Sequence, residues 1–128
     1  SSDVCSSDLG GLTFLDDSYN ASDVSMRAAL DALPEGRRII GVIGSMRELG
    51  IHTERVHRDV GLLARGKLSA LIGVGDEVAP LIEVFGDGQL CSDVESTTTC
   101  LRHISRPGDL IFLKGANAHG LWRIVEAF

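Results

Sequence analysis

Short apolar runs alternate with segments of helical periodicity along most of this chain. Four runs have the length of a strand and are continuously apolar, which is typical of strands covered on both faces: Leu12–Leu15, Ile39–Ile43, Ala70–Val74 and Leu110–Leu113. A shorter strand is predicted at Gln89–Cys91. Strands that alternate with helices indicate βαβ units. The pattern therefore predicts an α/β fold with a doubly wound, mainly parallel sheet and helices on both faces.

Between the predicted strands, apolar residues recur every three or four positions, which is the spacing of one helix face. The five stripes are Met26, Ala29, Leu30 and Leu33; Val56, Val60, Leu63 and Ala64; Val78, Leu81, Ile82 and Phe85; Val94, Thr97, Thr98 and Leu101; and Leu121, Ile124, Val125 and Phe128. Ser22 or Asp23 is the predicted N-cap of the first helix. The outer face of the second helix carries two oppositely charged pairs at i,i+4 spacing: Glu54 with Arg58, and Arg55 with Asp59.

The first nine residues do not follow this pattern. Ser1–Cys5 is nearly repeated by Ser6–Leu9, with neither a helical nor a strand period. The repeat resembles a translated sequencing-library adapter. We therefore predict that residues 1–9 are foreign to the gene and that the domain is residues 10–128. An ordinary flexible terminus is the alternative, and the DNA upstream of Gly11 distinguishes the two.

Composition narrows the class of protein. A chain of 128 residues that is 44% hydrophobic can bury one compact core. A net charge of -6 argues against nucleic acid as a partner, and no apolar run approaches the roughly 20 residues that span a bilayer. Cys5, Cys91 and Cys100 have no zinc-site spacing. These features predict a cytoplasmic domain without a metal site, in which Cys91 and Cys100 are small core residues.

Polar, glycine-containing connections follow three of the predicted strands: Asp16–Ala21, Gly44–Gly50 and Lys114–Asn117. Ligands of open α/β sheets bind at the carboxyl ends of the strands. The first connection offers side chains that suit a ribose or a phosphate, and Lys114 suits a carboxylate or a phosphate. Each connection alone is better explained as a turn or a solvated loop. Their common position at one edge of the sheet favours a ligand site.

Several motifs resemble the C-terminal domain of Mur ligases. The resemblance begins with Asp17–Ala21 and Ser25–Leu30, and it covers essentially everything after Gly11. It continues through Gly44-x-Met46-x-Glu48-Leu49-Gly50, through His57 with Gly61 four residues on, through Gly73–Gly75, and through Lys114-Gly115 before the last predicted helix. The chain is most similar to the branch of the family that joins D-alanyl-D-alanine to UDP-N-acetylmuramoyl-tripeptide.

The resemblance implies an ATP-dependent amide ligase of peptidoglycan synthesis, cytoplasmic and monomeric at full length. In this family ATP phosphorylates a substrate carboxylate, and the dipeptide amine attacks the acyl phosphate. Three residues match the nucleotide-facing motif, with the first of them at the ATP ribose: Asp17, Tyr19 and Asn20. Three others match the region implied to receive the dipeptide: Lys114, Gly115 and Asn117.

The resemblance assigns no catalytic or metal-ligating residue to this chain. The family's phosphate loop, Gly-x-x-x-x-Gly-Lys-[Ser/Thr], belongs to a central domain, and no such motif occurs in the 128 residues. ATP and Mg²⁺ are the implied cofactors, with the magnesium ligands expected in that central domain. The N-terminal and central domains are expected to be absent here. We therefore predict that the chain alone has no ligase activity and at most weak nucleotide affinity, because phosphoryl transfer depends on those groups.

The chain departs from the family pattern at three places that bear on substrate preference. Ser22-Asp23 stands where Asn-Pro is usual, Ser45 where an acid is usual, and Ala116-Asn117 where Ser-Arg is usual. His57 matches a family position without an implied role, and we place it on a polar helix face.

Two further interpretations stay open. One is the closing domain of another Mur ligase or of a folylpolyglutamate synthase, although Asp17–Asn20 differs from the Asp-Tyr-Ala-His of the ligase that adds the third peptide residue. The other is a stand-alone nucleotide-binding module.

Overall fold

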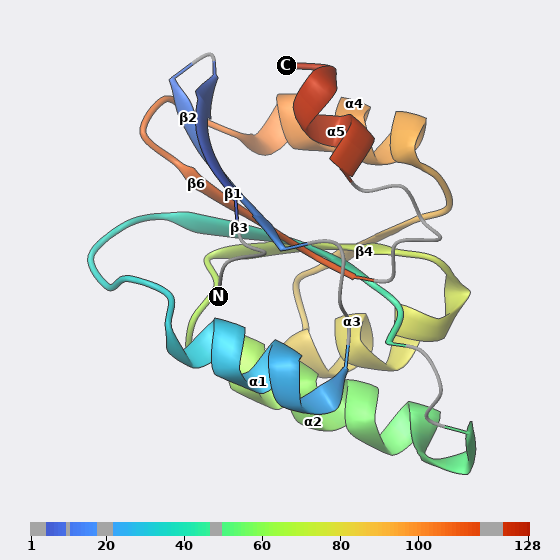
Figure 1. Ribbon diagram of the computed structural model, residues 1–128. Coiled ribbons are helices and arrows are strands. Elements are labelled where there is room, and N and C mark those ends of the chain that lie inside the picture. The colour runs from blue at the N-terminus through green and yellow to red at the C-terminus, as the bar shows by residue number, and fades with distance from the viewer. Residues whose placement is uncertain (1–4, 10, 18–21, 47–49, 116–121) are drawn as a thin grey trace.

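The computed structural model describes residues 5–9, 11–17, 22–46, 50–115 and 122–128. Within them one sheet has the strand order β1-β2-β6-β3-β4-β5 (Figure 1). The strands are β1 (Cys5–Leu9), β2 (Leu12–Asp17), β3 (Ile39–Gly44), β4 (Ala70–Val74), β5 (Gln89–Cys91) and β6 (Leu110–Lys114). All neighbouring strands from β2 to β5 are parallel, and β1 is antiparallel to β2. The predicted mainly parallel α/β sheet is confirmed.

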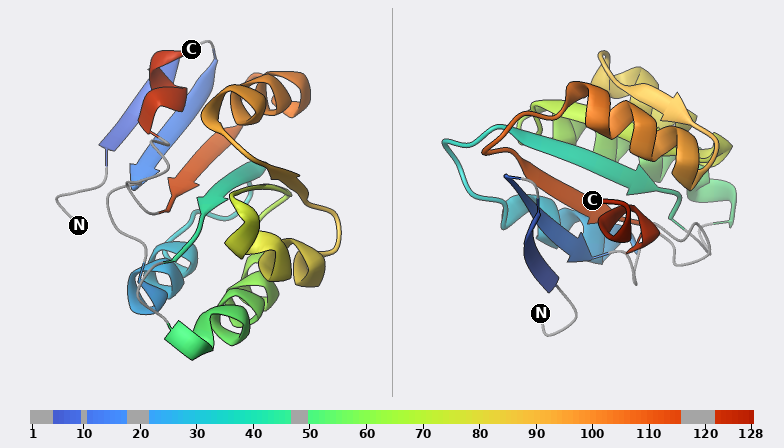
Figure 2. Two further views of the ribbon diagram at one scale, coloured as in Figure 1. Left: turned by 90° about the vertical axis from the view of Figure 1, so that its right-hand side faces the viewer. Right: turned by 90° about the horizontal axis from the view of Figure 1, so that it is seen from above.

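Helices cover both faces of the sheet, as the two halves of Figure 2 show from different sides. The helices are α1 (Asp23–Asp31), α2 (Thr53–Arg65), α3 (Ala79–Phe85), α4 (Val94–Ile104) and α5 (Trp122–Glu126), with short 3₁₀ turns at Gly50–His52 and Asp76–Val78. On one face, Ile39 and Ile43 of β3 pack with side chains of α1, α2 and α3. On the other, Ile40 and Val42 pack with α4 and α5. Because successive strand residues point to opposite faces, one apolar strand serves both cores.

The antiparallel edge strand β1 was not predicted. Cys5–Leu9 pairs with Leu12–Asp16 although its sequence lacks strand periodicity. An antiparallel strand at the edge of a sheet is held chiefly by backbone hydrogen bonds to one neighbour, so local side-chain patterning is a weak guide to it. The origin of residues 1–9 stays a prediction.

The predicted helices are confirmed, with one correction at their surfaces. Ser22 is the N-cap of α1, where it and Ser25 form a capping box. Arg58 pairs with Glu54 at 3.3 Å, as predicted. Asp59, however, pairs at 3.6 Å with Arg27 of α1 rather than with Arg55. Packing α1 beside α2 brings a second arginine to Asp59, and the i,i+4 spacing does not anticipate it.

Close packing of helices against the sheet explains two glycines. A Cβ atom on Gly61 of α2 would lie 2.8 Å from the carbonyl oxygen of Leu81 in α3. A Cβ atom on Gly73 of β4 would lie 2.7 Å from Val78. Both contacts are shorter than real Cβ atoms make. Gly61 meets a backbone oxygen, so its position requires glycine, whereas a side chain at Gly73 would displace side chains of the neighbouring helical segment.

Candidate functional site

The carboxyl ends of β2, β6 and β3 lie side by side, and each ends on a residue that the sequence analysis placed in a connection. Asp17 is the last residue of β2, Lys114 the last of β6, and Gly44 the last of β3. Asp17 pairs in register with Lys114, and Lys114 also pairs with Ile43. The predicted meeting of three strand ends at one edge is therefore confirmed, but these residues belong to the strands rather than to the loops that follow.

Lys114 is buried at this edge. Only 1% of its surface is exposed, so the alternative in which the side chain extends into solvent is wrong. Gly115, which follows it, is also buried. Among the described residues, no buried side-chain nitrogen or oxygen lacks a hydrogen-bond partner. The backbone of Lys114 is held by β2 on one side and β3 on the other.

Several residues of the predicted site lie outside the described part of the chain. They are Tyr19, Asn20 and Asn117, with Ala116 of the departure Ala116-Asn117. For Asp17 the structure describes the strand position only. Ser45, which stands where the family usually has an acid, is buried with 4% of its surface exposed.

His57 is buried at the centre of the same edge, which corrects its placement on a polar helix face. None of its surface is exposed. Its Nε2 atom accepts a hydrogen bond of 3.1 Å from the backbone N–H of Met46, two residues beyond β3. Its Nδ1 atom lies 2.7 Å from the carbonyl oxygen of Thr53 in the first turn of α2. The sequence pattern misassigned His57 because its neighbours Arg58 and Asp59 are polar, whereas Val56 and Val60 share its buried side.

The amino ends of the same strands carry a charged cluster that the sequence analysis missed. Asp109, just before β6, is 3% exposed and pairs with Arg38, just before β3. The Asp109 carboxylate also accepts a 2.8 Å hydrogen bond from the backbone N–H of Arg106. Arg37 donates to the carbonyl oxygen of Gly108 at 2.9 Å. The available signal was an arginine pair and an aspartate, each directly preceding an apolar run.

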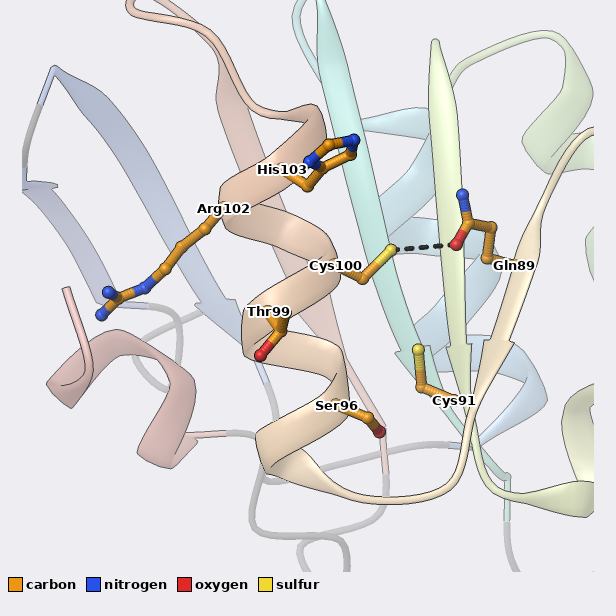
Figure 3. Close-up of a pocket in the computed structure, with 7 residues that line it drawn as sticks. All are labelled: Gln89, Cys91, Ser96, Thr99, Cys100, Arg102 and His103. Carbon is orange, nitrogen blue, oxygen red and sulfur yellow. Dashed lines mark hydrogen bonds between the residues drawn. The ribbon is translucent and has the colours of Figure 1, made fainter.

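A separate open groove of about 790 Å³ lies between α4 and β5, and Figure 3 shows its lining. Cys91 and Cys100 both face it and are half-buried against the core, so the prediction of core cysteines holds only in part. The Cys100 thiol donates to Oε1 of Gln89 at 3.1 Å. Burial, together with the nearby Cys91, raises the pKa of the Cys100 thiol, and a raised pKa makes a thiol less reactive.

The described residues contain neither a metal-binding cluster nor a membrane-spanning helix. No group of three or more His, Cys, Asp or Glu side chains is arranged to hold a metal ion within ranges 5–9, 11–17, 22–46, 50–115 and 122–128. In the same part of the chain, no helix combines the length and the apolar character needed to cross a membrane.

Comparisons with known proteins agree on one family. The family model described as Mur ligase, glutamate ligase domain, matches residues 3–117. A UDP-N-acetylmuramoyl-tripeptide–D-alanyl-D-alanine ligase of Mycobacterium tuberculosis is 36% identical over 91% of this chain and 28% of its own length. An Escherichia coli protein with the same description is 32% identical over 88% of this chain and 26% of its own. The chain thus spans little more than a quarter of these relatives.

Solved structures of similar proteins show the same fold. A MurF ligase from Thermotoga maritima in complex with ADP superimposes with a TM-score of 0.80 at 25% identity, over 96% of this chain and 29% of that one. A MurF from Acinetobacter baumannii gives 0.83 at 26% identity, over 96% and 28%. A bifunctional folylpolyglutamate synthase/dihydrofolate synthase from Yersinia pestis gives 0.66 at 13% identity, over 91% and 28%, which is a likeness of fold alone.

Proposed function

Since this chain belongs to the family of Mur ligase glutamate ligase domains, we propose that it is the C-terminal domain of an ATP-dependent peptide ligase. The proposed full-length enzyme joins D-alanyl-D-alanine to UDP-N-acetylmuramoyl-tripeptide in peptidoglycan synthesis, in the cytoplasm. The domain's proposed partner within that enzyme is a central ATP-binding domain. The relatives that match this chain carry the same reaction in their names, and the chain spans little more than a quarter of their length.

The observation that carries the proposal is the pairing of Asp17 with Lys114 at the carboxyl edge of the sheet. The resemblance gives these two residues different ligands, a nucleotide and a dipeptide. In the structure they are neighbours across one pair of parallel strands, at the edge where open α/β sheets bind ligands. A domain that presents both residues there can bring a nucleotide and an amine substrate to one place.

In the proposed mechanism the domain positions substrates rather than breaking bonds. The Asp17 carboxylate accepts hydrogen bonds from the ribose hydroxyls. Lys114, buried between β2 and β3, supplies a fixed positive charge for the dipeptide carboxylate. Tyr19, Asn20, Gly115 and Asn117 complete the two halves of the proposed site. Holding two reactants in a productive arrangement lowers the barrier by removing translational and rotational entropy beforehand.

ATP supplies the phosphoryl group that activates the substrate carboxylate. The Thermotoga maritima relative is described in complex with ADP, which supports nucleotide use by the full-length enzyme. Magnesium does not fit the described residues, since they contain no cluster of metal-binding side chains. We therefore derive no step of the reaction through magnesium here and expect its ligands in the central domain.

The decisive experiment is Asp17→Ala in the full-length enzyme. We expect ATP binding to weaken by about 1–3 kcal/mol, the usual contribution of a hydrogen bond to a charged group. Isothermal titration calorimetry measures the change, and Asp31→Ala, on the exposed end of α1, is the matched control. Equal ATP affinity in wild type and Asp17→Ala would remove Asp17 from the nucleotide site.

The purified 128-residue chain provides a second test. We expect no ATP-dependent amide formation, because the phosphate loop is not among its motifs. Measurable product from this chain with UDP-N-acetylmuramoyl-tripeptide, D-alanyl-D-alanine and ATP would contradict the proposal that another domain activates the ATP.

Related ligases are the second candidates, because their closing domains share this fold. Competition assays with the full-length enzyme separate them: D-alanyl-D-alanine, glutamate and diaminopimelate are offered together, and the amine that enters the product is identified. In a parallel assay with a folate as the acceptor, incorporation of glutamate would favour the folylpolyglutamate synthase interpretation.

A further inference from the structure

We infer that His57 is a positioning residue that holds the chain where it leaves β3, and thereby shapes the nucleotide-facing edge. The inference deepens the proposed function and rests on it for the identity of the ligand. No role for His57 follows from the family resemblance. The inference rests instead on the hydrogen bonds and the burial of the imidazole ring.

The imidazole of His57 bridges two backbone groups. One belongs to Met46, 11 residues earlier in the chain, and the other belongs to Thr53, 4 residues earlier. Nε2 lies 3.1 Å from the nitrogen of Met46, and Nδ1 lies 2.7 Å from the carbonyl oxygen of Thr53. A backbone N–H can only donate and a carbonyl oxygen can only accept. His57 therefore carries its proton on Nδ1, leaves Nε2 free to accept, and is neutral in this arrangement.

The ring has no role other than this bridge among the described contacts. It is fully buried, and Met46, Val56 and Val60 are buried as well. A leucine or phenylalanine would fill such a space without the cost of burying a polar ring. Met46 explains why a histidine stands at position 57. Met46 is 1% exposed, and without Nε2 of His57 the buried backbone N–H of Met46 would lack an acceptor. A buried donor without a partner is strongly disfavoured.

Met46 is close to the proposed ligand-binding residues along the backbone. It follows Gly44, the last residue of β3, by two positions. In the ladder, Ile43 pairs with Lys114, and Lys114 pairs with Asp17. A bond that fixes Met46 consequently fixes the exit of β3 beside those two residues. His57 lies in the first turns of α2. The segment that follows β3 is therefore hydrogen-bonded to a helix rather than to a loop.

The test uses three variants of the 128-residue chain. His57→Phe keeps a planar ring and removes the acceptor. His57→Gln keeps an amide oxygen that can accept from Met46. Val60→Ala, one turn further along α2 and equally buried, lowers stability without removing the acceptor of the Met46 N–H. Amide hydrogen exchange of Met46 reports the bond directly, and a nitrogen-correlated spectrum of the imidazole reports which nitrogen carries the proton.

A second measurement asks whether the bond matters for a ligand. ADP is titrated into each variant, and the amide shifts of Asp17, Gly44 and Lys114 are followed, since NMR detects binding even at about millimolar dissociation constants. We expect Met46 exchange to be about tenfold faster in His57→Phe, near wild type in His57→Gln and unchanged relative to global stability in Val60→Ala. ADP affinity should follow the same order.

The outcomes separate the inference from the proposed function. Unchanged Met46 exchange in His57→Phe, or a spectrum with Nε2 protonated, would overturn the positioning role. Equal loss of ADP affinity in Val60→Ala and His57→Phe would show that stability alone is responsible, and would also overturn it. If ADP shifts none of the three edge amides in the wild-type chain, the nucleotide assignment fails, while the exchange data still decide whether His57 holds Met46.

Discussion

The amino and carboxyl edges of the parallel sheet differ in the charged residues that they carry and in the contacts of those residues. At the amino edge, Arg38 and Asp109 pair with one another between the starts of β3 and β6. Two backbone hydrogen bonds of 3.0 Å lie at this edge as well: Thr13 N–H of β2 donates to the Asp109 carbonyl, and Leu110 N–H of β6 donates to the Arg38 carbonyl. At the carboxyl edge, Lys114 is buried beside the end of β2, and a neutral histidine holds the exit of β3.

The difference separates an edge that stabilises the fold from the edge proposed to bind ligands. Charges at the amino edge are matched within the chain, so we expect them to contribute to folding and not to ligand binding. The carboxyl edge carries glycine exits and buried polar side chains on adjacent strands. Tying the strands together at one end positions their other ends, which is what a preorganised site requires.

The largest effect that tests this comparison is on stability. Arg38→Ala leaves the Asp109 carboxylate buried without its cation, and breaking such a pair costs about 3 kcal/mol. We expect that loss in the free energy of unfolding, measured by urea denaturation, with ADP-induced shifts at the carboxyl edge unchanged. Arg37→Ala is the control: its guanidinium bonds are exposed, so we expect a loss of about 1 kcal/mol or less. Equal losses in the two variants would contradict a special role for the Arg38–Asp109 pair.

A smaller effect is expected at the opposite edge, on catalysis. Lys114→Met removes the charge and keeps an unbranched side chain of similar length. In the full-length enzyme we expect the KM for D-alanyl-D-alanine to rise about tenfold, or about 1.4 kcal/mol, with ATP affinity retained. Lys67→Met, between α2 and β4 at the amino edge, should leave both parameters unchanged. A change in ATP affinity alone would show that Lys114 serves the nucleotide instead.

The smallest expected effect is on the pH dependence of stability and concerns Asp93. This residue follows the end of β5 at the carboxyl edge and is the N-cap of α4. Hydrogen bonds from the backbone N–H and the hydroxyl of Ser96 lower the pKa of this exposed carboxyl group. A lowered pKa means that the bound carboxylate stabilises the fold above the ordinary pKa of 3.8, and that this contribution is lost as pH falls through the lower folded value.

Asp93→Asn keeps a capping oxygen that does not titrate in this range. We expect the wild type to have a slightly higher Tm near neutral pH and the two proteins to converge at about pH 2. Thermal melts across that range measure it. A difference in Tm that is constant with pH would show that the carboxylate charge contributes nothing.

Local patterns were a good guide wherever a residue's role depends on its near neighbours. The apolar run Ile39–Ile43 predicted a strand buried on both faces, and Ser22 was one of the two predicted caps. The capping bond spans three residues, so it is visible in sequence. The strand ends were predicted too short, because Asp17, Gly44 and Lys114 are polar or small. Pairing with neighbouring strands extends them in the ladder regardless of their own propensity.

The sequence by itself determined the order of elements from β2 onward, the α/β class and the three connections that carry candidate chemistry. Only the tertiary structure decided that β6 lies between β2 and β3, which places Lys114 beside Asp17 although 97 residues separate their numbers. It also decided that His57 is buried against Met46 and that Asp109 meets Arg38. Hydrophobic periodicity says which face of an element is covered. It does not say which distant segment covers that face, because strand order is set by packing between elements that are far apart in the chain.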